Sequence, residues 1–90
     1  MKIPNQVKIG AHIYKIKIVN ENSDLELENN GRVDKVKGLI TLDGTLMPTE
    51  LSGTFLHEIL HVINNELDHA LLDSLSQQLL QVLEDNKLLK

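Results

Sequence analysis

The chain contains no cysteine among its 90 residues, and this absence excludes several kinds of site. Disulfide bonds, zinc fingers with cysteine ligands and thiol catalysis all need a sulfur atom that the sequence does not offer. A small domain without disulfides depends on the packing of its core, to which a bound metal can add stability. The composition is typical of a protein from a reducing compartment, and we expect it in the cytoplasm.

Aromatic residues are almost missing as well, because Tyr14 and Phe55 are the only two. Proteins that bind single-stranded nucleic acid stack bases on aromatic side chains, and two such residues give little surface for stacking. The formal net charge is -4, so phosphate backbones and anionic lipids repel the chain as a whole. We therefore expect neither nucleic acid nor a membrane surface as a direct partner.

Long hydrophobic runs are also lacking. No apolar segment approaches the length of about 20 residues that a membrane-spanning helix needs. The first eight residues, MKIPNQVK, lack the apolar core of a secretion signal. A chain of this length forms one hydrophobic core, so we expect a single domain over residues 1–90.

Two hydrophobic periodicities divide this domain near Pro48. Before it, apolar residues alternate with polar ones over residues 6–19, which predicts a strand hairpin with its turn at Gly10. Asn29, Asn30 and Gly31 are residues that favour the left-handed backbone of a tight turn. Further short strands are predicted at residues 25–28, 32–36 and 39–43.

After Pro48 the apolar spacing changes to that of a helix. The pattern predicts one helix over residues 48–66 and a second over residues 70–87. The short connection between them favours an antiparallel helix hairpin. The predicted fold class is α+β, in which a small antiparallel or mixed sheet from residues 1–47 packs against a helical part from residues 48–90.

The first of these helices contains the motif HExxH, spelled by His57, Glu58 and His61. Residues four apart lie one above the other on a helix, so the two imidazoles can both reach one Zn²⁺ at about 2.0–2.1 Å. Glu58 borders the same face, where it can take a proton from a metal-bound water. The alternative to a metal site is a solvated helix face with two unrelated histidines. We favour a zinc site with Glu58 as general base, because the polar residues of this face are not needed for packing.

The residues around the motif resemble those of the zincin metallopeptidases, and most closely the small phage and prophage proteins of the ImmA/IrrE type. The resemblance covers roughly residues 32–86 and rests on GRVD at 31–34, LITL at 39–42, TFLHEILH at 54–61 and VLEDN at 82–86. It implies a small mixed sheet with the active-site helix across it, and an extended peptide substrate along an edge strand near residues 39–43. Proteins of this type cleave phage or mobile-element repressors, so the resemblance implies a cytoplasmic proteolytic switch.

A catalytic zinc usually has three protein ligands and one open position, and the resemblance implies a glutamate on a following helix as the third. Glu66 is rotated away from the two histidines. In a helix hairpin, Glu84 lies roughly 13 Å too far from the turn. Asp73 lies close to the level of the histidines, and we select it as the third ligand. His69, in the connection, is the alternative, and would complete a site of three histidines.

Other candidates remain open. Tyr14, Arg32 and His69 are the residues available to stabilise an oxyanion beside the zinc. His12, far from the motif in sequence, is interpreted as a surface strand residue. The favoured function is a zinc-dependent metallopeptidase acting on a protein or peptide. The alternative is a zincin-like binding module with a structural or vestigial metal, which would dock through its edge strand or its helix hairpin.

Overall fold

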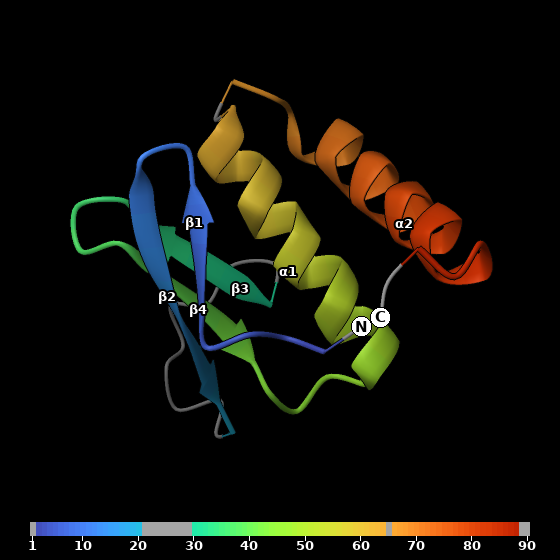
Figure 1. The fold of residues 1–90 in the computed structure, drawn as a ribbon, viewed down its shortest axis with the longest axis horizontal. Coiled ribbons are helices and arrows are strands. Elements are labelled where there is room, and N and C mark those ends of the chain that lie inside the picture. The colour runs from blue at the N-terminus through green and yellow to red at the C-terminus, as the bar shows by residue number, and fades with distance from the viewer. Residues whose placement is uncertain (1, 21–29, 65, 89–90) are drawn as a thin grey trace.

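The computed structural model describes residues 2–20, 30–64 and 66–88 of the chain. It confirms the predicted α+β fold, with a four-stranded sheet followed by two helices (Figure 1). The strands are β1 (Gln6–Ile9), β2 (His12–Val19), β3 (Gly31–Asp34) and β4 (Leu39–Asp43), and the helices are α1 (Pro48–Ile63) and α2 (His69–Asp85). The strand expected at residues 25–28 lies outside the described residues.

The four strands are arranged in the order β1-β2-β4-β3. β1 and β2 form the expected hairpin, and Gly10 in its turn has a φ of 62°, which suits glycine. β2 pairs with β4 in parallel, whereas β3 pairs with β4 antiparallel, so the sheet is mixed. Asn30, with a φ of 70°, turns the chain into β3 as the turn signal predicts.

This order corrects one expectation. The segment near Leu39–Asp43 was expected to form the edge strand that receives a substrate, but β4 lies inside the sheet between β2 and β3. Its hydrogen-bonding groups are therefore occupied by strands on both sides. Among the described strands, the edge beside α1 is β3 instead.

The hydrophobic core lies between one face of the sheet and α1, which crosses that face (Figure 1). Its buried members are Tyr14 from β2, Ile40 and Leu42 from β4, and Phe55 from α1. These are few residues, but they fix α1 by its middle turn. As a result the face of α1 that carries the HExxH motif is held at a defined angle beside β3.

Pro48 occupies the first turn of α1, as the sequence predicts. The helix ends at Ile63, three residues earlier than expected, because Asn64 adopts an extended backbone and its side chain accepts a hydrogen bond from the Glu66 amide at 3.0 Å. Asp68 caps α2 by accepting a hydrogen bond from the Ala70 amide at 2.9 Å. These two side chains shape the connection that lets the chain reverse.

The two helices lie side by side and antiparallel (Figure 1). Leu72 and Leu80 of α2 are buried, as is Ser76 between them. Among the described elements, α1 is the only one to which the backbone of α2 comes close. Within the described chain, neither helix combines the length and the apolarity that crossing a membrane requires.

Candidate metal centre

Three histidines meet where α1 runs beside the first turn of α2. His57 and His61 stand one turn apart on α1, and their ring centroids are 4.8 Å apart. His69, the first residue of α2, lies 5.5 Å from His57 and 4.7 Å from His61 between ring centroids. The short connection after Asn64 brings this third ring to the pair.

One ligand nitrogen from each ring can be chosen so that all three lie within 4.8 Å of one another. This group could hold a metal ion. Its members differ in exposure, since His57 is buried, His61 half-buried and His69 exposed. A site of this kind opens to solvent on the side of α2.

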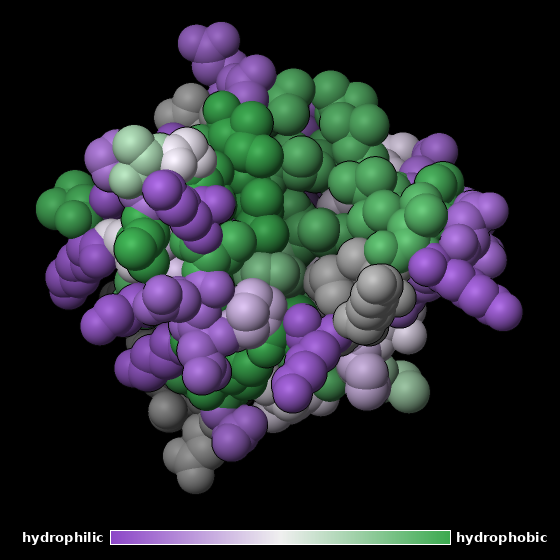
Figure 2. Space-filling view, in the orientation of Figure 1, coloured by the Kyte–Doolittle hydropathy of each residue, from purple (hydrophilic) through white to green (hydrophobic). Residues whose placement is uncertain are grey.

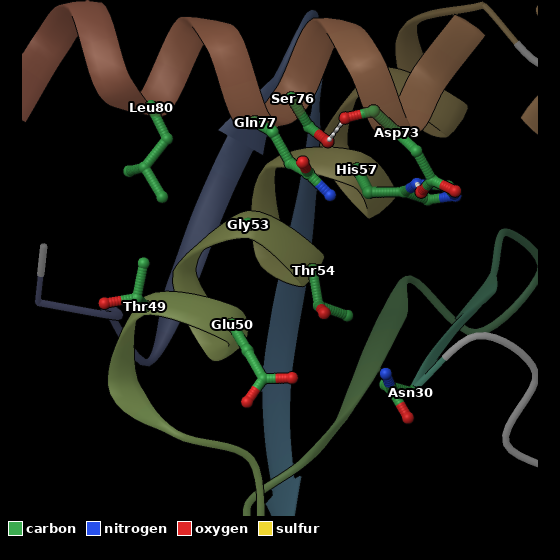
Figure 3. Close-up of a pocket in the computed structure, with 10 residues that line it drawn as sticks. All are labelled: Asn30, Thr49, Glu50, Gly53, Thr54, His57, Asp73, Ser76, Gln77 and Leu80. Atoms are coloured by element: carbon green, nitrogen blue, oxygen red, sulfur yellow. Dashed lines mark hydrogen bonds and ion pairs between the residues drawn. The ribbon is translucent and has the colours of Figure 1, made fainter. Parts of the chain in front are cut away.

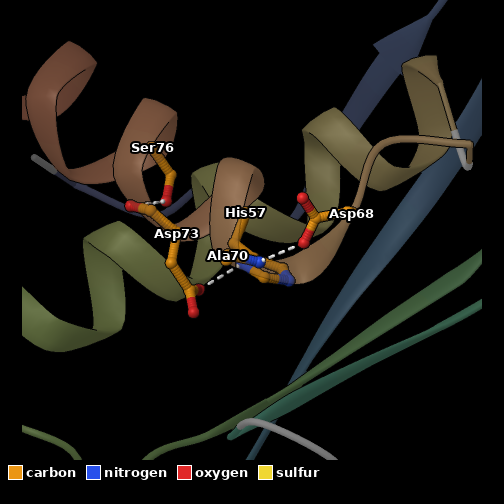
Figure 4. A network of polar contacts seen from close by, with 5 residues as sticks. All are labelled: His57, Asp68, Ala70, Asp73 and Ser76. Carbon is orange, nitrogen blue, oxygen red and sulfur yellow. Dashed lines mark hydrogen bonds and ion pairs between the residues drawn. The ribbon is translucent and has the colours of Figure 1, made fainter.

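Asp73, one turn further along α2, contacts the buried histidine rather than standing apart from the cluster. Its Oδ1 lies 2.7 Å from Nδ1 of His57 (Figure 4). The other ring nitrogen, Nε2, is buried and has no hydrogen-bond partner among the described residues. Buried polar atoms are nearly always paired, so an orphaned imidazole nitrogen beside two further imidazoles fits a metal ligand.

The environment of His61 favours the neutral imidazole that binds metals. Burial lowers the pKa of His61 most, and His57, His69 and Lys35 lower it further by charge, whereas Asp73 acts in the opposite direction. A neutral ring keeps its lone pair available, and metal binding requires the deprotonated ligand. Lys35 lies in the turn between β3 and β4, so this influence comes from the sheet.

Glu58 is buried on the side of α1 that faces β3, with only 4% of its surface exposed. Burial raises the pKa of Glu58 to about 7, because the charged form is penalised in a desolvated place. A carboxyl group with a pKa near neutrality is suited to accept and return a proton. Glu58 directly follows His57 on α1, and its side chain lies against Gly31 of β3.

Gly31 of β3 makes room for this carboxylate. A Cβ at residue 31 would lie 2.9 Å from Cγ2 of Thr54, 3.2 Å from Cγ of Glu58 and 3.3 Å from Cδ2 of Leu42. Thr54 is β-branched and stiff within a helix, so it cannot move aside cheaply. The edge strand therefore approaches α1 this closely only because residue 31 has no side chain.

We expect Gly31→Ala to destabilise the protein by about 1–3 kcal/mol through overpacking and to displace Glu58 at the same time. Gly53→Ala is the matched control. A Cβ at residue 53 meets nothing within 4 Å. Alanine in place of a helical glycine raises the free energy of unfolding by about 0.5–1 kcal/mol. Thermal unfolding of the two variants should shift the melting temperature in opposite directions. An equal effect of both substitutions would contradict the close approach at Gly31.

A cleft of about 540 Å³ lies between α1 and α2, and His57 is the one histidine among its lining residues (Figure 3). Its wall on α1 carries Thr54 and His57, and its wall on α2 carries Asp73 and Gln77. The complete lining is Asn30, Thr49, Glu50, Gly53, Thr54, His57, Asp73, Ser76, Gln77 and Leu80. The cleft exposes polar and apolar surface in similar amounts, and Asn30 connects it to the start of β3.

The structure brings His57, His61 and Asp73 of the predicted site together, and Glu58 lies beside Gly31 of β3. Asp73 reaches the cluster by way of His57 Nδ1, and the group of three potential ligands contains His69 in its place. The sequence pattern missed the contribution of Lys35, because no local signal shows that the β3–β4 turn lies beside the end of α1.

Three other candidates lie elsewhere. Tyr14 is part of the hydrophobic core. Arg32 follows Gly31 on β3 and so belongs to the face of the sheet that points away from α1. His12 is exposed at the start of β2, outside the group of three histidines, as expected.

Comparison with known proteins adds no relative to this description. Neither protein-family profiles, nor curated proteins, nor solved structures contain a match to the chain. The site has to be interpreted from its own residues and their geometry.

Proposed function

We propose that the protein is a zinc-dependent metallopeptidase of the zincin kind. The observation that carries this proposal is the meeting of three imidazoles from two helices beside the buried glutamate of an HExxH motif. Each part of the motif has a counterpart in the structure. Two histidines share a helix face, a third histidine comes from the following helix, and burial raises the pKa of Glu58, which directly follows His57.

The proposed ligands are His57, His61 and His69. Three imidazole nitrogens and one open position form a typical catalytic zinc site, and imidazole is a good ligand for zinc. Asp73 is proposed to act on His57 rather than on the metal, since its carboxylate would hold Nδ1–H and so direct Nε2 towards the ion. Such carboxylate–histidine pairs fix the tautomer and the ring orientation of metal ligands.

A bound zinc ion would lower the pKa of a water molecule towards about 7 and polarise a substrate carbonyl. Glu58 would take the proton from the attacking water and pass it to the departing amine, for which its pKa near neutrality is suited. The cleft between α1 and α2 would hold the peptide beside the histidines. The edge strand β3 would align its backbone by strand addition.

The resemblance to ImmA/IrrE-type proteins extends this proposal to the substrate. A phage or mobile-element regulator is the protein class we propose for cleavage, in the cytoplasm of a host cell. The polar side chains in the lining of the cleft offer hydrogen-bonding groups to a peptide.

The direct test is to measure zinc in the purified protein and hydrolysis of a labelled, unstructured protein such as casein. We expect about one zinc per chain, loss of hydrolysis after removal of the metal by a chelator, and its return when zinc is added back. Absence of zinc would refute the proposal. Zinc binding without any hydrolysis would favour the second function, a zincin-like binding module.

A further inference from the structure

The cleft between α1 and α2 has two ends of different character. Glu50 and His57 both line it from α1, and they are seven residues apart, or about 10.5 Å along the helix axis. Leu80 lines it from α2, seven residues after Asp73, which contacts His57. Because the two helices are antiparallel, Glu50 and Leu80 lie at about the same level, two turns away from the pair of His57 and Asp73.

Gly53 leaves the cleft open between these two ends. It lies on α1 between Glu50 and His57 and belongs to the lining. A Cβ at residue 53 would meet nothing within 4 Å, so the packing of the protein does not require a glycine here. In Figure 3 Gly53 lies in the middle of the lining residues, between Gln77 of α2 and Glu50. The space beside Gly53 can therefore hold a side chain of a bound molecule.

Glu50 gives its end of the cleft a negative charge. The lining contains two carboxylates, those of Glu50 and Asp73, and it contains no lysine or arginine. Asp73 lies 2.7 Å from Nδ1 of His57, whereas the structure shows no hydrogen bond or ion pair to the side chain of Glu50 within the described parts of the chain. The carboxylate of Glu50 is therefore available to a positively charged group that enters the cleft.

The positive charges of the chain lie away from this end of the cleft. No lysine or arginine occurs between Lys37 and Lys87, so both helices lack them. Seven of the nine lysines and arginines precede residue 38, and Figure 2 shows hydrophilic side chains gathered over the strands. A cleft with charge of one sign concentrates ligands of the opposite charge. This cleft should therefore attract cations and repel anions.

A lysine or arginine side chain matches both the charge and the surface at this end. Its charged group can pair with Glu50, while its aliphatic stem can lie along apolar surface, which Leu80 supplies at the same level. A hard metal ion would need several oxygen ligands, and Glu50 is the one carboxylate of the lining at this end. The buried, unpartnered Nε2 of His57, which lines the other end, independently indicates that a ligand belongs there.

We propose that Glu50 selects a basic side chain in the peptide substrate, about three residues from the bond that is cut. This inference rests on the proposed function, because it takes the cleft as the place where the peptide lies beside the metal ligands. An extended peptide advances about 3.3 Å per residue, so three residues span the distance between His57 and Glu50. Glu50 is thus a residue that determines specificity, and it takes no part in the chemical step.

Digestion of denatured casein, with the products sequenced by mass spectrometry, tests this selection. We expect the wild type to favour bonds that have lysine or arginine about three residues away, by up to about fivefold, which is the effect of an exposed ion pair. Glu50→Gln should lose this preference, and Glu50→Lys should favour acidic residues instead. Glu66→Lys is the matched control, because it makes the same change of charge at an exposed position outside the lining. It should keep the wild-type preference.

A binding measurement separates this inference from the proposed function. Amide signals of the nitrogen-15-labelled full chain are followed by NMR, with and without zinc, while a short alanine–serine peptide with one central lysine is added. We expect shifts at Gly53 and Gln77, much smaller shifts with the same peptide carrying glutamate, and the reverse order in Glu50→Lys. Gly53→Leu fills the space beside Gly53 and should remove the shift of Gln77.

The two experiments fail in different ways. Shifts specific to the lysine peptide without any hydrolysis would refute the peptidase and leave the charge selection of the cleft standing. Hydrolysis that shows the same preference in the wild type and in Glu50→Lys would refute the selection alone. Equal effects of the two peptides on the amide signals, or no effect of either, would also overturn the role of Glu50.

Discussion

Glu58→Gln is expected to reduce peptide hydrolysis by about 100- to 10,000-fold, the range that a general acid or base contributes. Glutamine has nearly the same shape but cannot accept the proton of the attacking water. The substitution should change the free energy of unfolding little, because Glu58 is buried and burial already favours its neutral form. The loss should appear in kcat for a labelled protein substrate.

Zinc content and circular dichroism of the Glu58→Gln protein supply the controls. Glu58 is outside the proposed ligand set, so the zinc content should match that of the wild type. Hydrolysis that continues at the wild-type rate would mean that Glu58 is not the base. Loss of zinc together with activity would place its carboxylate on the metal.

The second large effect concerns metal affinity. We expect His57→Ala and His61→Ala to weaken zinc binding by more than the factor of about 10–100 that follows loss of an outer partner. His69→Ala should behave like these two, and Asp73→Asn should stay within that smaller range. Competition with a chromophoric chelator measures the affinity of each variant.

His12→Ala is the control for this series, because it removes the remaining histidine of the chain, which is exposed on β2. Its zinc affinity should equal that of the wild type. The two residues from α2 decide the third ligand. If Asp73→Asn lost zinc as severely as His57→Ala while His69→Ala retained it, Asp73 would be the third ligand. That result would agree with the prediction from the sequence.

The helices and the pairing of His57 with His61 could be predicted from the sequence, because the signals that specify them are local. Pro48 marks the start of α1, and the change of hydrophobic period separates the sheet from the helix hairpin. HExxH predicts the meeting of His57 and His61 because four residues make about one turn of a helix. The structure confirms the fold class and places these two rings together.

Long-range relations were harder to predict. A compact run of strand-favouring residues predicts a strand at Leu39–Asp43, but it cannot show that β2 pairs with this strand in parallel and places it inside the sheet. The level of a residue along a helix hairpin depends on the connection, and Asn64 ends α1 earlier than the apolar pattern suggests. That earlier end lengthens the connection and starts α2 at His69, which brings a third imidazole to the pair.

The packing of α2 against α1 alone has a consequence for how the protein comes apart. Because the backbone of α2 comes close to α1 alone among the described elements, we expect this helix to detach as a separate cooperative unit while the sheet and α1 stay folded. A metal with ligands from both helices would bind only when α2 is packed against α1. It would therefore stabilise that packing by mass action. In that case the ion that we propose for catalysis would also stabilise the position of α2.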